Sequence, residues 1–348
     1  MPKLPTKPNP MPRYRGFNLS DMFVLDSDPR FHDMTPDGRA RFQEDDFRWI
    51  AGWGFDFVRL PLTYQSWAPR EDPGDIDEAK LAPLDDAVGW GRKHGVHVSI
   101  CLHHAPGYCV NIHHAPEHVA EPRDLWTSPE KQAAFVHTWE TFARRYAGVP
   151  ASELSFDLVN EPKHVSPDEH NPAAVAATEA IRAVSPDRPV VADGLEIGRQ
   201  ANPGLIPLGV WQSCRGYSPG KLTHHKAWWG GGHPYEPAVD WPLVDRTTGE
   251  VYGREDMAAE YDPWVELIDA GVGVHCGEMG CYHHTPHGVF LRWMEDLLQI
   301  LREREMGWAL WNFRGSFGML DSGRADAPYT DWHGHQLDHK LLELLQRY

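Results

Sequence analysis

No stretch of the 348-residue chain approaches the run of about eighteen apolar residues that predicts a membrane-spanning helix. Blocks of about five or six basic residues, which are typical of tails that bind nucleic acid, are also missing. The chain instead carries 50 Asp and Glu against 33 Lys and Arg, a formal net charge of −17. This acidity argues against nucleic acid and anionic membranes as partners, so we expect a small or neutral molecule.

Cysteine is scarce, and residues 1–14 contain no apolar segment of the kind found in signal peptides. The chain is therefore expected to be cytoplasmic if Met1 is the native start, and secreted if a signal peptide was removed. Five cysteines, with no CxxC pair, predict neither a disulfide framework nor a zinc site. Cys101, Cys214 and Cys276 lie in apolar runs and are predicted to be small buried side chains.

Short runs of β-branched and aromatic residues recur along the whole chain, and most of them are apolar throughout. Continuous apolar runs of this length are typical of parallel strands that are buried on both faces. The predicted strands are Arg15–Leu19, Phe55–Pro61, Val96–His103, Leu154–Asn160, Pro189–Gly194, Gly209–Arg215, Val272–Gly277 and Trp308–Phe313.

Helical patterns with start signals lie between these runs. Ser128–Pro129 and Thr285–Pro286 are each predicted to open an amphipathic helix, and Asn171–Pro172 an Ala-rich one. A further helical pattern runs from Met257 to Gly271. Only residues 195–208 separate the fifth predicted strand from the sixth, so the helix expected there is short or absent.

Strands that alternate with helices indicate a parallel α/β fold, and eight such units are the number that closes a (β/α)8 TIM barrel. A doubly wound sheet would carry a glycine-rich turn after its first strand, whereas Ser20–Phe23 follows here. With no linker or repeat in the sequence, we expect one catalytic domain at 14–348 and an N-terminal extension at 1–13. We also expect the protein to be a monomer. The long connections at 105–127 and 218–250 are expected to build the site.

Two predicted strands deliver a glutamate at their ends. The fourth strand ends in Asn160–Glu161–Pro162, and the seventh in Gly277–Glu278–Met279. In a barrel both side chains would reach the same mouth. A pair of carboxylates facing each other across a cleft is what glycoside hydrolysis requires, since one donates a proton and the other attacks or stabilises the sugar. Ion pairs at the barrel rim are the structural alternative.

The sequence resembles glycoside hydrolase family 5, the cellulase-like enzymes, over nearly its whole length. The resemblance is carried by five elements in the same order along the chain: Phe57–Pro61, Leu102–Gly107, Val159–Pro162, Gly277–Gly280 and Trp308–Phe313. It implies that Glu161 is the acid/base, that Glu278 is the nucleophile, and that the anomeric configuration is retained.

The resemblance also implies a set of substrate-binding residues. Arg59 is expected beside the nucleophile, and Asn160 is expected to bind the sugar 2-hydroxyl. His103 is expected to line the subsite where cleavage occurs, and Trp311 to be the platform on which a sugar stacks. His104 should point away from His103, so it is either a second sugar contact or a packing residue.

One position departs from the family pattern, which has a His-x-Tyr pair after the sixth strand. The tyrosine is matched by Tyr217, which is expected to bind the nucleophile, but Arg215 occupies the histidine position. Two explanations stay open: Arg215 adds a second cation to the site, or His224 supplies the imidazole from the loop.

Further tryptophans lie in the predicted loops, where they are either sugar platforms or loop anchors. The candidates are Trp67, Trp126, Trp228 and Trp229. If several of them line an open groove, the enzyme cuts within a polysaccharide; if long loops close one end, it trims oligosaccharides.

We therefore expect a retaining β-glycosidase, with an endo-β-1,4-glucanase acting on β-linked oligo- or polysaccharide as the first hypothesis. An exo-acting β-glucosidase or β-mannosidase, or a β-mannanase, is the alternative. No metal or cofactor is expected, because the first strand offers no His-x-His ligand pair. A metal-dependent barrel hydrolase and a non-catalytic carbohydrate-binding barrel remain distant alternatives; retention of both glutamates argues against the second.

Overall fold

The computed structural model describes residues 2–23, 42–111, 123–227, 229 and 238–348. The chain divides into two compact units, and each is described by itself. The first unit contains the described residues of 19–23 and 42–214, and the second contains those of 2–18 and 215–348.

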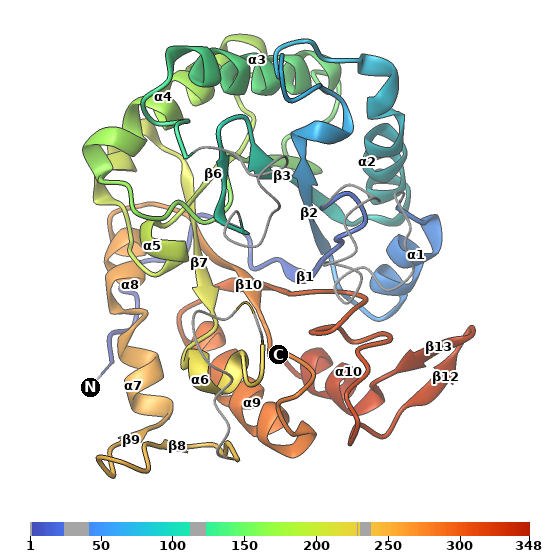
Figure 1. The fold of residues 1–348 in the computed structure, drawn as a ribbon, viewed down its shortest axis with the longest axis vertical. Helices are drawn as coiled ribbons and strands as arrows, with labels where there is room; N and C mark the ends of the chain where they lie inside the picture. The colour runs from blue at the N-terminus through green and yellow to red at the C-terminus, as the bar shows by residue number, and fades with distance from the viewer. Residues whose placement is uncertain (1, 24–41, 112–122, 228, 230–237) are drawn as a thin grey trace. The chain divides into compact units, whose positions relative to one another are not determined.

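The first unit is built on parallel strands, which Figure 1 shows in blue to yellow. β2 (Phe57–Thr63) pairs with β3 (His97–Ala105), β3 with β5 (Leu154–Asp157), β5 with β6 (Val190–Asp193), and β6 with β7 (Trp211–Gly216). The two-residue β4 (Tyr108–Cys109) folds back antiparallel onto the end of β3. The helices are α1 (Glu44–Gly52), α2 (Ala82–His94), α3 (Pro129–Arg145), α4 (Pro167–Val184) and the short α5 (Leu195–Gly198).

The second unit continues the same alternation of strand and helix. β11 (Gly307–Leu310) pairs in parallel with both β1 (Arg15–Asn18) and β10 (Val274–Met279). The helices are α6 (Gly220–Thr223), α7 (Arg254–Ala259), α8 (Asp262–Asp269), α9 (His287–Glu303) and α10 (His339–Gln346). Two small antiparallel pairs, β8 (Leu243–Val244) with β9 (Val251–Tyr252) and β12 (Thr330–Trp332) with β13 (His335–Leu337), complete it.

All eight predicted strands are present, as β1, β2, β3, β5, β6, β7, β10 and β11. The fold is the eight-stranded parallel TIM barrel that the alternation predicts. The connection between β6 and β7 carries only the four-residue α5 and a 3₁₀ turn at Pro203–Leu208, as its length required. Cys101, Cys214 and Cys276 are buried, and none of the five cysteines, all of them described, forms a disulfide.

Local chemistry explains where the helices begin. Ser128 caps α3 by accepting a hydrogen bond from the Lys131 amide, as predicted. The predicted start of α4 at Asn171–Pro172 is wrong, because the helix begins at Pro167. Ser166 and Glu169 form a capping box there, in which the Ser166 amide donates to Glu169 Oε2 at 3.0 Å. Pro172 consequently lies inside the helix.

The predicted N-terminal extension lies against α8 in the second unit. The amide and hydroxyl of Thr6 both donate to Asp269 Oδ1, at 2.7 and 2.9 Å. Asn9 Nδ2 donates to the carbonyl of Val274, where β10 begins, at 2.7 Å. These contacts tie the extension to α8 and to the start of β10, the strand that carries Glu278.

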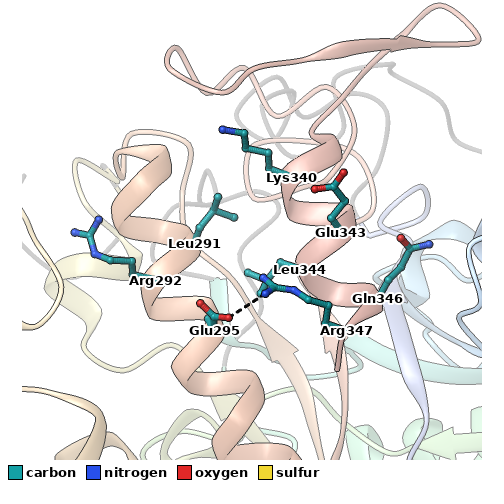
Figure 2. A pocket seen from close by; sticks show the side chains of 8 residues that line it. All are labelled: Leu291, Arg292, Glu295, Lys340, Glu343, Leu344, Gln346 and Arg347. Carbon is teal, nitrogen blue, oxygen red and sulfur yellow. Dashed lines mark ion pairs between the residues drawn. The ribbon is translucent and has the colours of Figure 1, made fainter.

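An open groove of about 760 Å³ lies between α9 and α10 (Figure 2). Charged side chains line most of it, and Arg347 pairs with Glu295 at 3.3 Å. None of the predicted site residues that the structure describes lines this groove. Across the described ranges, no helix is long and apolar enough to cross a membrane.

Candidate active site

Arg59 lies in the middle of β2 and is fully buried. Its Nε donates to Asp157 Oδ2 at 2.7 Å, and its Nη2 lies 3.6 Å from Asp193 Oδ2. The two aspartates lie at the ends of β5 and β6. A buried guanidinium is tolerated only when carboxylates and hydrogen bonds compensate for its lost hydration. Arg59 therefore fixes these two strand ends relative to β2.

Arg59 also orients Asn160. Its Nη2 donates to Asn160 Oδ1 at 2.8 Å, so the amide nitrogen of Asn160 points to the other side, where it lies 3.5 Å from His103 Nε2. His103 is buried and contacts the edge of the Phe23 ring at 4.3 Å between centroids. The structure thus brings three of the predicted residues into one contiguous group within the first unit.

His104 points away from His103, as the alternation along a strand predicts. Its Nδ1 lies 3.1 Å from Thr63 Oγ1, and its ring packs edge-on against Tyr64 at 5.2 Å. These contacts belong to the packing role. A contact between His104 and the sugar stays a prediction.

Glu161 is the next residue after Asn160 in the chain, and it is 8% exposed. Its backbone has a φ of 51°, a left-handed conformation that is uncommon for residues other than glycine. The amide of Glu161 donates to Asp193 Oδ2 at 2.8 Å, and its carbonyl accepts from the Tyr108 hydroxyl at 2.6 Å. Side chains therefore hold both backbone groups of Glu161.

Glu278 lies at the end of β10 in the second unit and is 3% exposed. The Tyr217 hydroxyl donates to its Oε2 at 3.0 Å, and Arg215 Nη2 lies 3.4 Å from its Oε1. Arg215 therefore lies beside Glu278 as a cation, which is the geometry that the first of the two open explanations requires. A position of Arg59 beside the nucleophile stays a prediction.

His224 contacts Tyr217, and its role as a substitute for the histidine of the family stays a prediction. The two rings meet edge-on at 5.2 Å, and His224 Nδ1 lies 3.0 Å from Thr223 Oγ1. His224 therefore supports the tyrosine that binds Glu278.

Aromatic side chains gather near this end of the second unit. Trp229 packs edge-on against Tyr282 at 4.7 Å, and Phe317 lies 5.6 Å from Tyr282 and 6.2 Å from Tyr217. Trp311, which follows β11, is 5% exposed, whereas Trp308 within the strand is fully buried. Trp308 is therefore a packing residue of the barrel. The role of Trp311 as a sugar platform stays a prediction.

The other loop tryptophans differ from one another. Trp67 is fully buried against Phe142, 5.4 Å between centroids, so it is a loop anchor. Trp126 lies between Tyr108 and His170, at 5.3 and 5.1 Å. Trp228 lies outside the described residues.

Sequence reasoning missed Asp193 and Tyr108 on one unit and Tyr282 and Phe317 on the other. Asp193 carried a usable signal, because it is a polar residue at the end of an otherwise apolar strand. Tyr108, Tyr282 and Phe317 lie in connections with no periodicity to read. In the described part of the chain, no three His, Cys, Asp or Glu side chains are grouped so that they could hold a metal ion.

The chain is similar to known proteins over most of its length. Residues 34–316 match the family model described as Cellulase (glycosyl hydrolase family 5). Endoglucanase C of Acetivibrio thermocellus is 24% identical over 299 residues, which are 78% of this chain and 83% of that protein. Cellodextrinase A of Ruminococcus flavefaciens is 26% identical over 268 residues, 74% of each chain. A solved structure described as a glycoside hydrolase is 36% identical, with a TM-score of 0.86, and the match covers 96% of this chain and 99% of that one.

The TIM-barrel fold and the matching family model place the chain in the class of glycoside hydrolases. The family model covers most of the chain. The chain belongs to glycosyl hydrolase family 5.

Replacing Arg59 with Met should leave Asp157 buried without its cation. We expect the free energy of unfolding to fall by about 3–5 kcal/mol, the range found when one partner of a buried ion pair is removed. Urea denaturation followed by circular dichroism measures this loss.

Arg92→Met is the matched control for this experiment. Arg92 pairs with Glu153 at 2.7 Å in the same unit, but the two side chains are 49% and 36% exposed. Its loss should cost less than about 1 kcal/mol. Equal losses in the two variants would contradict the structural role assigned to Arg59.

Proposed function

We propose that the protein is a retaining β-glycoside hydrolase, and that its reaction is endo-β-1,4-glucanase cleavage of β-1,4-glucan. The observation that carries the proposal is the environment of Glu278, a buried carboxylate with a guanidinium on one oxygen and a phenol on the other. This is how a protein prepares an anionic nucleophile. Glu161 follows β5, the fourth strand of the barrel, and is the second carboxyl that the reaction requires.

Hydrolysis would proceed in two displacements. In the first, Glu278 attacks the anomeric carbon while Glu161 gives its proton to the departing glycosidic oxygen, which leaves a covalent glycosyl-enzyme. In the second, Glu161 takes a proton from water, and the resulting attack on the anomeric carbon releases Glu278. Two inversions at one carbon give net retention.

Arg215 and Tyr217 would act before the first bond is made. The positive charge and the hydroxyl proton stabilise negative charge on Glu278, and they fix the direction of its two oxygens. Arginine stays charged at every working pH, unlike the histidine common at this position in the family. The support for the nucleophile would therefore not be lost as the pH rises.

The remaining predicted residues would hold the sugar. Asn160, whose oxygen accepts from Arg59, presents its amide N–H as a donor to a sugar hydroxyl, and His103 lies beside it. Trp311 and Trp229 offer faces for stacking. These roles are part of the proposal, as is the assignment of β-1,4-glucan, which the relative named endoglucanase C supports.

Cleavage of short oligosaccharides is the second candidate. The relative named cellodextrinase A supports it over a similar share of the chain. The two candidates use the same chemistry at Glu161 and Glu278 and differ in how many sugars the cleft accepts.

Single replacements of the two glutamates test the mechanism. Glu278→Ala should abolish hydrolysis, and azide should partly restore turnover by attacking from the vacated side, which gives a glycosyl azide of inverted configuration. Glu161→Ala should stay active only on substrates whose leaving group needs no proton, such as dinitrophenyl glycosides. Initial rates and NMR of the products measure both effects.

Hydrolysis of cello-oligosaccharides at the parent rate by either variant would contradict these assignments. Glu295→Ala is a suitable control, because Glu295 lies on α9 in the groove of Figure 2, outside the proposed site. Its rates should match the parent's.

Product analysis on a substrate panel tests the specificity. With cellohexaose, mannohexaose, laminarin and aryl β-glycosides, the proposal predicts internal cleavage of cellohexaose and the slowest turnover on laminarin. Single sugar units released from one end of cellohexaose would favour the oligosaccharide alternative. Faster cleavage of mannohexaose would overturn the glucan assignment.

A further inference from the structure

Two side chains hold the backbone of Glu161 rather than its carboxyl. Asp193 Oδ2 accepts from the Glu161 amide at 2.8 Å, and the Tyr108 hydroxyl donates to the Glu161 carbonyl at 2.6 Å. Asp193 comes from the end of β6 and Tyr108 from β4. Two separate elements therefore hold the two peptide groups that flank the Cα of Glu161. All three residues are buried.

These two hydrogen bonds hold Glu161 in a disfavoured backbone conformation. Its φ of 51° is disfavoured for a residue that carries a Cβ, and a chain left to itself would return to the extended or right-handed region. Hydrogen bonds to both backbone groups oppose that return. Asp193 and Tyr108 therefore stabilise the backbone conformation from which the Glu161 side chain projects.

Each contact is itself built rigidly. Tyr108 follows Gly107, whose φ is 76° and where a Cβ would lie 2.9 Å from the Leu125 backbone nitrogen, so the turn that carries Tyr108 requires glycine. Burial raises the pKa of the Tyr108 phenol far above its ordinary value, so its proton is always available for donation. On the other side, Asp193 Oδ2 lies 3.6 Å from Arg59 Nη2, which fixes the carboxylate.

We propose that Asp193 and Tyr108 are positioning residues that aim the Glu161 carboxyl at the leaving-group oxygen through its backbone. The inference rests on the proposed role of Glu161 as acid/base. Neither residue touches the substrate in this account. Their loss would misplace the proton donor without removing it.

Leaving-group dependence separates this role from a general structural one. A misplaced acid slows bond cleavage only where the departing oxygen needs a proton, and kcat/KM reports this first displacement. In Tyr108→Phe, we expect kcat/KM on cello-oligosaccharides to fall about 10- to 100-fold, the range for a small misplacement of a reacting group. On dinitrophenyl β-cellobioside it should change by less than about twofold, since the leaving group needs no proton.

Asp193→Asn should show the same selectivity, because the amide oxygen accepts more weakly than a carboxylate. Tyr146→Phe is the matched control. Tyr146 is another buried tyrosine of the first unit, and its hydroxyl donates to Asp85 at 3.0 Å. Its loss should leave the ratio of the two kcat/KM values at the parent value, even if the melting temperature falls.

Measuring kcat/KM of Glu161→Ala on the same two substrates distinguishes a failure of the positioning role from a failure of the acid/base assignment. Suppose Glu161→Ala lowers kcat/KM only on cello-oligosaccharides, while Tyr108→Phe keeps the parent ratio of the two kcat/KM values. The positioning role is then wrong, and the acid/base assignment stands. If Glu161→Ala slows both substrates equally, the acid/base assignment is wrong and the positioning role falls with it. Should Asp193→Asn fail to fold, Tyr108→Phe decides alone.

Discussion

The buried charge of Arg59 is the constraint on which the first unit's functional residues depend. A guanidinium cannot shed its charge inside a protein, so carboxylates and hydrogen-bond acceptors must come to it. Asp157, Asp193 and Asn160 do so from the ends of neighbouring strands. Because Asp193 also accepts from the Glu161 amide, the same charge that holds the barrel strands in register orients two consecutive residues of the proposed site.

Glu278 in the second unit depends on a simpler arrangement. Arg215 and Tyr217 are two residues apart where β7 ends, so their side chains emerge on the same side and reach the two oxygens of one carboxylate. A permanent cation replaces a titratable ring at the position where the family commonly has histidine. In the proposed mechanism the chain would keep the chemistry of the family and change how the nucleophile is supported. The His224 ring packs against Tyr217.

The sequence was informative wherever a residue's role follows from its place on a strand. Continuous apolar runs located all eight parallel strands, and the residues at their ends included Glu161, Glu278 and Asn160. It failed where the partners are distant: the contacts of Asp193 and Tyr108 with Glu161 join residues 32 and 53 positions apart and leave no local pattern. It also failed where two local signals competed, since Ser166–Pro167 with its capping box starts α4 ahead of Asn171–Pro172. Burial alone distinguished Trp67 as an anchor, which its loop position could not do.

Trapping the covalent intermediate tests the central claim, that Glu278 is the nucleophile of a retaining glycosidase, most directly. A dinitrophenyl 2-deoxy-2-fluoro-β-cellobioside slows both displacements through its fluorine, while its leaving group lets the first one proceed, so the glycosyl-enzyme accumulates. Mass spectrometry of the intact and digested protein should show one sugar per chain, attached by an ester to the peptide that contains Glu278. A label on any other residue, or inactivation without a covalent label, would contradict the account.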